Sequence, residues 1–418
     1  MDPTHMNGSD HLKISVAAPP LWTYLAGDTI IGSVNRCSRI VAPDAIISLA
    51  LIGHAKTLIE RNASNHTNKY HGVWELFEFT PQILYRGPVH IPKVPQGSGS
   101  DNINLSFSIN IPKTASLSAL RDHAQAESFI PLHAGYIAQH PLSGTFSSEW
   151  PGAKLCIDYH LRAQLQYKCN GSWQVQRATV PITLGHPIVD PSTICFALQR
   201  KSISSGVCGH RLLPSIQNEK LSLTQKTQKL FRLSKKPGFY FTVDMLMPLH
   251  IQLDNPARIP LILRVVPQEN GTSDVIKDVV HPIKINWMNL SILSQVEIVC
   301  KPNSSGCCKI PKDENVFTQD LGLNRVFSEL KEPIVTFSGP RDQQINIGNI
   351  LQLALTHDGL RSGGKHLSQS VSMQPSFVTF NIRLSHKIIW EMSLGIAGET
   401  RTISTEAGVT IHNSATRL

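Results

Sequence analysis

The sequence lacks the long hydrophobic runs that would place it in a membrane. No stretch of about 18 apolar residues occurs, so we expect no transmembrane helix among the 418 residues. The first ten residues have neither a basic start nor an apolar core, which argues against a secretory signal. Without secretion, the Asn-x-Ser/Thr triplets, such as those at Asn62 and Asn170, are chance matches.

Motifs for common metal and redox chemistry are missing too. The chain has eight cysteines but no Cys-x-x-Cys pair, and zinc sites are typically built from spaced pairs of ligands. Cys300, Cys307 and Cys308 cluster in sequence, and Cys208 is followed by His210. We interpret these as free thiols, with metal binding as the alternative. Free thiols indicate a reducing compartment, so we expect a cytoplasmic protein.

The composition predicts a folded chain with more than one domain. Charged residues make up 17% and hydrophobic residues 41% of the sequence, which is typical of globular rather than disordered proteins. A chain of this length is too long for one ordinary β-sandwich and long enough for two domains with separate cores.

Most of the positive charge falls in one segment. Between Cys195 and Gly238, nine basic residues stand against Glu219 alone, which gives +8 and leaves +1 of the formal +9 for the rest of the chain. Such a segment can attract an acidic partner or an anionic membrane surface; the alternative is a solvated linker. The candidate residues for binding an anionic surface are Arg200, Lys201, Arg211, Lys220, Lys226, Lys229, Arg232, Lys235 and Lys236.

The clearest secondary-structure signal lies in residues 155–167. Apolar residues alternate there with polar ones over the whole stretch, a period of two that predicts a β-strand with one face in a core and one face in water. Asn170-Gly171 follows and then a second alternating run, which predicts a β-hairpin. Residues 103–111 alternate in the same way and end at Pro112, which cannot donate to a sheet.

The second half of the chain repeats this pattern. Shorter strand-like runs precede a second long predicted strand, residues 377–394, which occupies the same late position as 155–167 does in the first half. One face of it carries Ile388, Trp390, Met392 and Leu394. The pattern alone therefore favours two β-sandwiches in tandem.

The order and spacing of these elements resemble the arrestin-like proteins, specifically the alpha-arrestins of fungi. The resemblance covers about residues 12–187 well and 238–412 more loosely. The stretches that carry it are 26–34 (AGDTIIGSV), 48–57 (SLALIGHAKT), 84–88 (LYRGP), 109–112 (INIP), 140–142 (HPL), 157–165 (IDYHLRAQL) and 376–387 (SFVTFNIRLSHK).

The resemblance implies a non-catalytic adaptor in the endocytosis and ubiquitin-dependent turnover of membrane proteins. Such proteins bind membrane cargo, for example transporters, and recruit a HECT-type ubiquitin ligase through Pro-Pro-x-Tyr motifs. This sequence has no Pro-Pro-x-Tyr, and Pro19-Pro20-Leu21-Trp22 carries a tryptophan in place of the tyrosine. The alternative is a cytosolic protein–protein interaction scaffold that does not recruit the ligase directly.

We therefore expect an all-β fold of two tandem antiparallel immunoglobulin-like β-sandwich domains, arrestin-like, joined by a basic connector. The expected segments are a disordered N-terminus (1–11), the N-terminal sandwich (12–189), the connector (190–237), which can contribute an edge strand, the C-terminal sandwich (238–412) and a tail (413–418). We expect no nucleic-acid partner, and a location peripheral to the plasma membrane or endosomes.

Two stretches carry residues that resemble parts of catalytic or nucleotide-binding sites. Residues 359–366 come within one residue of a phosphate-binding P-loop, but His366 replaces the hydroxyl residue, so a glycine-rich hairpin is the favoured interpretation. Asp158 and His160 share the polar face of a strand, which we interpret as solvated because no Gly-x-Ser-x-Gly nucleophile motif accompanies them. We expect no catalytic, cofactor or metal site.

Overall fold

The structure is a computed structural model of the whole chain that describes residues 6–9, 12–19, 22–36, 39–63, 66–77, 80–91, 103–116, 127–132, 134–137, 139–169, 171–190, 196–214, 236–301, 310–338, 344–367 and 372–414. Within these residues β-strands dominate and the helices are short, which confirms the predicted all-β class. None of the helices in this part of the chain has the length and apolar character needed to cross a bilayer.

The N-terminal half comprises eleven described strands and one short helix. These are β1 (Met6–Ser9), β2 (Leu12–Val16), β3 (Thr23–Tyr24), β4 (Thr29–Arg36), β5 (Ile40–Ala63), β6 (His66–Glu75), β7 (Gln82–Ile91), β8 (Ile103–Asn110), α1 (Ala134–Ile137), β9 (Phe146–Trp150), β10 (Ala153–Cys169) and β11 (Ser172–Leu184).

The C-terminal half begins with strands that flank the basic segment. The elements from there to residue 320 are β12 (Leu198–Cys208), the 3₁₀-helix η3 (His210–Leu212), β13 (Gly238–Pro248), β14 (His250–Gln252), β15 (Ile262–Pro267), the 3₁₀-helix η5 (Asp274–Ile276), β16 (Pro282–Val299) and β17 (Lys312–Asp320). The remaining elements are α3 (Leu323–Glu329), β18 (Ile334–Phe337), β19 (Gln344–Asn346), α4 (Ile347–Ile350), β20 (Leu353–Thr356), β21 (Gly359–Ser362), β22 (Lys365–His366), β23 (Phe377–Val378), β24 (Ile382–Ile396) and β25 (Glu399–His412).

The two halves have the same strand order. The first half has a four-stranded sheet, β1-β2-β4-β8, and a seven-stranded sheet, β3-β11-β10-β5-β6, in which β7 pairs with β5 and β9 with β10. The second half has β12-β13-β15-β19 and β14-β25-β24-β16-β17, in which β18 pairs with β16 and β23 with β24. The short parallel pairs correspond as well, because β3 pairs with β11 in the first half as β14 pairs with β25 in the second.

The long strand predicted from alternation is β10, at the middle of its sheet. The residues on its apolar face, from Leu155 to Leu165, are all buried, and most of the residues between them are partly exposed. Cys169 of β10 pairs with Ser172 of β11, and Gly171, just before Ser172, has a φ of 81°. Glycine adopts this left-handed conformation at no steric cost, and the hairpin prediction is confirmed.

Residues 377–394 differ from their prediction as one strand. They form β23 and β24, which pair with each other across a tight turn at residues 379–381, where the Thr379 hydroxyl accepts a hydrogen bond from the Ile382 amide at 3.1 Å. The apolar face of β24 is as predicted, with Ile388, Trp390, Met392 and Leu394 at most 2% exposed.

Strands occur in the N-terminal stretch, which was predicted to be disordered, and in the connector, where the prediction allowed an edge strand. Residues 6–9, within the stretch predicted to be disordered, form β1 and pair with β2. Residues 198–208 of the predicted connector form β12, an edge strand paired with β13 along its full length, so this part belongs to a sheet of the C-terminal half.

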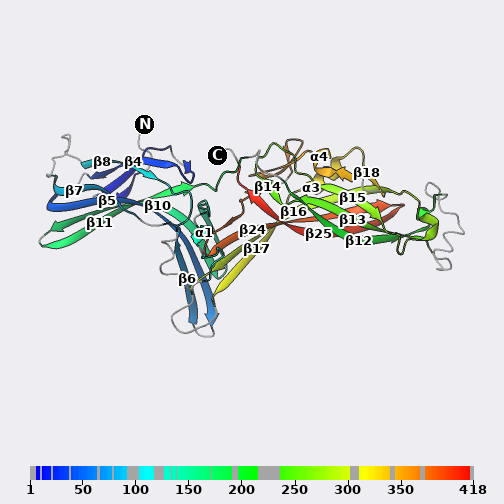
Figure 1. Cartoon of the computed structure of the whole chain (residues 1–418), viewed down its shortest axis with the longest axis horizontal. Helices are drawn as coiled ribbons and strands as arrows, with labels where there is room; N and C mark the ends of the chain where they lie inside the picture. The colour runs from blue at the N-terminus through cyan, green and yellow to red at the C-terminus, as the bar shows by residue number, and fades with distance from the viewer. Residues whose placement is uncertain are drawn as a thin grey trace.

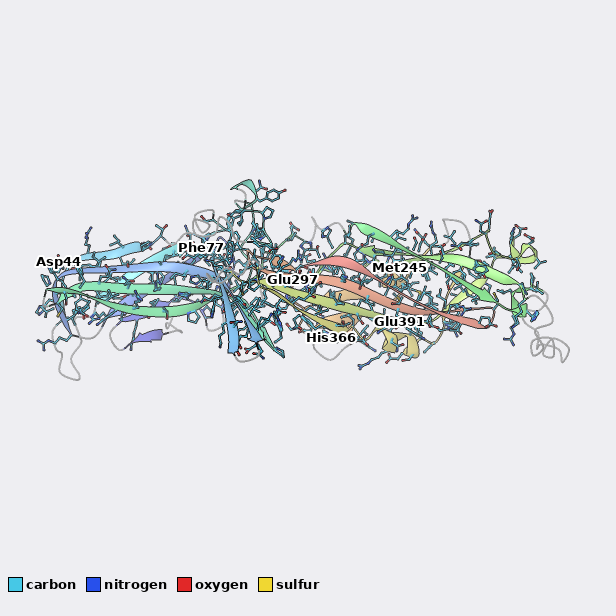
Figure 2. The ribbon with its side chains drawn as sticks, turned by 90° about the horizontal axis from the view of Figure 1, so that it is seen from below. Asp44, Phe77, Met245, Glu297, His366 and Glu391 are labelled. Atoms are coloured by element: carbon cyan, nitrogen blue, oxygen red, sulfur yellow. The ribbon has the colours of Figure 1, made fainter. Side chains whose placement is uncertain are left out.

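Each half has its own hydrophobic core. The first core is shared by residues of β2, β4 and β8 from one sheet and of β5, β10 and β11 from the other, which is consistent with a β-sandwich. The second core joins β13 and β15 to β16, β24 and β25. The halves lie end to end, and the β5–β6 hairpin projects beside β17 where they meet (Figure 1). β5 starts near Asp44 at the outer end of the first half, whereas Glu297 of β16 lies at the junction (Figure 2).

Candidate functional site

The candidate anionic-surface residues that the structure describes occupy two separate places. Arg200 and Lys201 lie near the start of β12, opposite Leu246 and Met245 of β13. Arg211 follows the other end of β12, roughly 30 Å away at about 3.3 Å per residue. The described basic residues therefore do not form one patch. Lys220, Lys226, Lys229, Arg232 and Lys235 lie outside the described residues.

Acidic side chains lie close to the basic residues at both ends of β12. Arg200 Nη1 lies 4.0 Å from Oδ2 of the buried Asp244, which also pairs with Arg264. Arg211 and Lys236 line a small cavity of about 150 Å³ together with Glu399, which lies at the β24–β25 turn. The side chain of Arg200 is 61% exposed and remains accessible to an anionic surface.

The most constrained part of the molecule is the junction between the halves. Thr57 of β5 is buried and donates a hydrogen bond from its hydroxyl to the carbonyl of Val299 at 2.9 Å. Asn381, which is fully buried, donates from its side-chain amide to the carbonyl of Ala55 and to the Thr57 hydroxyl, both at 3.2 Å. These bonds join the end of the N-terminal sheet to the turn between β23 and β24.

Main-chain bonds and aromatic packing complete the junction. The Phe129 amide donates to the carbonyl of Phe380 at 2.9 Å, and the Lys301 amide donates to the carbonyl of His71 at 3.2 Å. The rings of Phe380 and Trp74 stack with centroids 5.1 Å apart. Phe380 is fully buried in the core of the N-terminal half, so the C-terminal half contributes side chains to the first core.

Gly72 of β6 makes this close approach possible. It lies opposite Thr57 in the sheet, and a Cβ atom placed on it would lie 2.4 Å from the Thr57 hydroxyl oxygen and 3.0 Å from the carbonyl oxygen of Val299. A larger residue would force the Thr57 side chain to shift and would press on the carbonyl of Val299.

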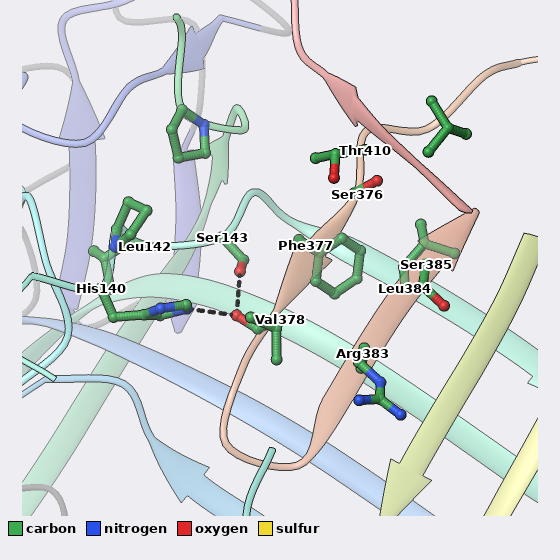
Figure 3. A pocket seen from close by; sticks show the side chains of 13 residues that line it. His140, Leu142, Ser143, Ser376, Phe377, Val378, Arg383, Leu384, Ser385 and Thr410 are labelled. Atoms are coloured by element: carbon green, nitrogen blue, oxygen red, sulfur yellow. Dashed lines mark hydrogen bonds between the residues drawn. The ribbon is translucent and has the colours of Figure 1, made fainter. Parts of the chain in front are cut away.

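An apolar cavity lies beside the junction (Figure 3). Its volume is about 360 Å³, and its lining includes Leu142 from the first half and Phe377, Leu384 and Val409 from the second. His140 Nε2 and Ser143 Oγ both donate to the carbonyl of Val378, at 2.8 and 3.3 Å. The His-Pro-Leu stretch that contributed to the family resemblance thus contacts β23.

Two buried histidines have strongly lowered pKa values. Burial lowers the pKa of His186 to about 4, with a further contribution from His357, and its ring lies 5.2 Å from that of Phe377 at the junction. Burial likewise lowers the pKa of His386 to about 4, although its Nδ1 lies 2.9 Å from the Ser294 hydroxyl. Nε2 of neither ring has a hydrogen-bond partner among the described residues.

The polar face of β10 is more enclosed than the sequence predicts. Asp158 lies directly opposite His54 of β5, and the side chains of Asp158 and His160 are only 34% and 22% exposed. His160 Nδ1 is 3.6 Å from Asp158 Oδ2, and Lys56 Nζ is 3.0 Å from the same carboxylate. The side-chain nitrogen or oxygen atoms of His54, Asp158 and His160 lie within 4.8 Å of one another, close enough to hold a metal ion.

Sequence reasoning identified Asp158 and His160 but missed His54. The signal was present, because His54 falls on the same face of its strand as Lys56. The pairing register between β5 and β10 brings His54 opposite Asp158. This register cannot be read from the sequence alone.

The P-loop-like stretch and the cysteine cluster do not form a nucleotide or metal site within the described residues. Residues 359–366 form β21 and β22 joined by Gly363-Gly364, both with positive φ, which agrees with the hairpin interpretation rather than with a P-loop that opens a helix. Cys300 is buried, and its Sγ lies 3.3 Å from the Thr57 hydroxyl. Cys307 and Cys308 lie outside the described residues.

Comparisons with known proteins add no identification. Neither the models of protein families nor the curated proteins compared with this chain gave a match.

Replacing Asn381 tests the junction. Asn381→Ala removes the side-chain amide that donates to Ala55 and Thr57 at a fully buried site and leaves a cavity, so we expect the free energy of unfolding to fall by about 1–3 kcal/mol. Asn349, an exposed residue of α4, serves as the control, and Asn349→Ala should leave stability within about 0.5 kcal/mol of the wild type. Denaturant unfolding of both variants measures the difference, and equal stabilities would contradict the role given to Asn381.

The buried histidines predict acid sensitivity. Their folded-state pKa of about 4 lies below the ordinary histidine pKa of about 6.5, so the unfolded chain takes up protons first. The free energy of unfolding should have its full value above about pH 6.5. It should fall by about 3 kcal/mol per histidine as the pH approaches 4. Unfolding measured from pH 7.5 to 4 should show a smaller fall for His386→Gln. The exposed residue His90 provides a control, since His90→Gln should retain the wild-type pH dependence.

Proposed function

We propose that this chain is a non-catalytic, arrestin-like adaptor in the trafficking of membrane proteins, built from two tandem β-sandwich domains. The observation that carries the proposal is the repeated strand order. A four-stranded and a seven-stranded sheet occur twice with corresponding neighbours, each pair around one core. Together with the family resemblance in sequence, this repeat supports the arrestin-like arrangement.

The surfaces of the sheets support a role in docking. β12 and β17 are both edge strands, whose outer backbone groups can pair with an extended segment of a partner. On β17, Val316 and Phe317 are 48% and 46% exposed, so a partner strand would also find apolar side chains there. Cytoplasmic segments of membrane cargo, such as transporters, are the partners that the resemblance implies.

The basic residues support attachment to a membrane. Each lysine or arginine near an anionic surface contributes about 1 kcal/mol before screening by salt. We propose that the basic segment between β12 and β13 brings the protein to the plasma membrane or endosomes, where its cargo resides. A HECT-type ubiquitin ligase would then act on the bound cargo, reached directly or through a second adaptor.

Vesicle binding tests the membrane contact. The variant with glutamine at positions 226, 229, 232, 235 and 236 should bind vesicles containing phosphatidylserine less tightly than the wild type at low salt, because five positive charges are lost. A control variant loses five exposed lysines elsewhere, namely Lys154, Lys168, Lys277, Lys331 and Lys365. If both variants lose the same affinity, binding depends on the net charge of the protein and not on this segment. If the five-glutamine variant binds as tightly as the wild type, the segment has no role in membrane attachment.

Cargo turnover in the native cell tests the adaptor function itself. Proximity labelling should identify plasma-membrane transporters, and deletion of the protein should slow the ubiquitin-dependent degradation of those transporters. Re-expression of the wild type should restore degradation, and expression of the five-glutamine variant should restore it less. Labelling of soluble proteins only, with unchanged transporter turnover, would instead support the cytosolic scaffold.

A further inference from the structure

We propose that His54, Asp158 and His160 form a binding site for a divalent transition-metal ion, with zinc as the preferred ion. The site lies on the face of the N-terminal seven-stranded sheet that is directed away from the first core, and it is independent of the trafficking role.

The backbone of the sheet fixes the three residues in position. His54 and Asp158 are paired residues on adjacent strands, and His160 follows two positions along β10, on the same face as Asp158. The intervening Tyr159 is 3% exposed and anchors β10 in the core. β10 is paired with β11 on its other side, and β5 is paired with β6 from His54 onward. The ligands are therefore held by central strands rather than by loops, which favours a defined geometry.

The distances between the side chains suit a metal ion. Their candidate ligand atoms lie within 4.8 Å of one another, and tetrahedral zinc with bonds of about 2.0–2.1 Å brings its ligands to about 3.3 Å apart. Small rotations of the side chains would close this difference. His54 Nδ1 is shielded from solvent and has no hydrogen-bond partner among the described residues. This nitrogen is therefore an unsatisfied polar atom that a metal ion could bind.

Lys56 is the competitor for this site. Its ammonium nitrogen lies 3.0 Å from Asp158, where it occupies the carboxylate that a metal ion would bind. The Lys56 side chain is 40% exposed, so it can move into solvent when the ion binds. This arrangement gives a diagnostic expectation, because removing Lys56 should strengthen metal binding, whereas it would only weaken an ordinary ion-pair network.

The donor set selects the class of ion. Two imidazoles and one carboxylate are ligands typical of zinc and related divalent transition metals, whereas Ca²⁺ and Mg²⁺ prefer oxygen ligands alone. Zinc has no geometric preference from its d electrons, so it tolerates the arrangement that the strands impose. A fourth position would be filled by water or by Cys156, whose Sγ lies 4.0 Å from Asp158 Oδ1.

Titration of the metal-free full-length chain with Zn²⁺ at pH 7.5, followed by calorimetry, tests the proposal. We expect one site that a large excess of Mg²⁺ does not displace. His54→Gln and His160→Gln should each weaken binding at least about 100-fold, the upper value seen for the loss of outer-shell partners, and Lys56→Gln should strengthen it several-fold. Absorption of the Co²⁺ complex reports whether a thiolate is bound, and Cys156→Ser should abolish any such band.

A matched control comes from the other close histidine pair. His250 and His412 have ring nitrogens 3.2 Å apart, and His412→Gln should leave the Zn²⁺ affinity of the proposed site unchanged. Thermal unfolding without metal checks that each variant folds. The proposal is overturned if the wild type binds no Zn²⁺, or if folded His54→Gln and His160→Gln bind it as tightly as the wild type.

Discussion

The buried hydrogen bonds around Thr57 connect the two halves of the molecule. The Thr57 hydroxyl, the Asn381 amide and the carbonyls of Ala55 and Val299 satisfy one another where little water reaches them. Separating the halves would leave these groups unpaired until water replaced the lost bonds, and it would also expose Phe380, which packs in the first core. The relative position of the halves is therefore set by specific polar contacts as well as by apolar area.

Strand β5 links this junction to the rest of the N-terminal half. Its 24 residues extend for roughly 80 Å at about 3.3 Å per residue. Four consecutive residues of β5 alternate between two faces. Ala55 and Thr57 face the junction, whereas His54 and Lys56 face the opposite side. A ligand on the outer face at His54 would thus bind next to the backbone that accepts the hydrogen bond from Asn381. The proposed metal site and the junction share a short length of one strand.

Histidines in this protein illustrate how the environment determines chemistry. His186 and His386 lie where burial disfavours the charged ring, so they act as neutral packing and hydrogen-bonding groups. His54 and His160 lie on a partly exposed face beside a carboxylate and a lysine, where a ring nitrogen can also serve as a ligand. The residue type is the same, and the degree of enclosure and the neighbouring charges decide its role.

Local sequence patterns predicted the secondary structure correctly wherever alternation was regular. The strands now seen as β8 and β10, the Asn170-Gly171 hairpin and the apolar face of β24 all follow from a period of two and from turn chemistry, which are local properties of the chain. Tertiary contacts set three further features. His54 faces Asp158, and residues 377–394 bend at Thr379 so that Asn381 reaches Thr57. The four basic candidates within the described residues divide between the two ends of β12. Each of these depends on strand register or on contacts between residues far apart in the chain, and the alternation of a single strand carries no information about which partner lies beside it.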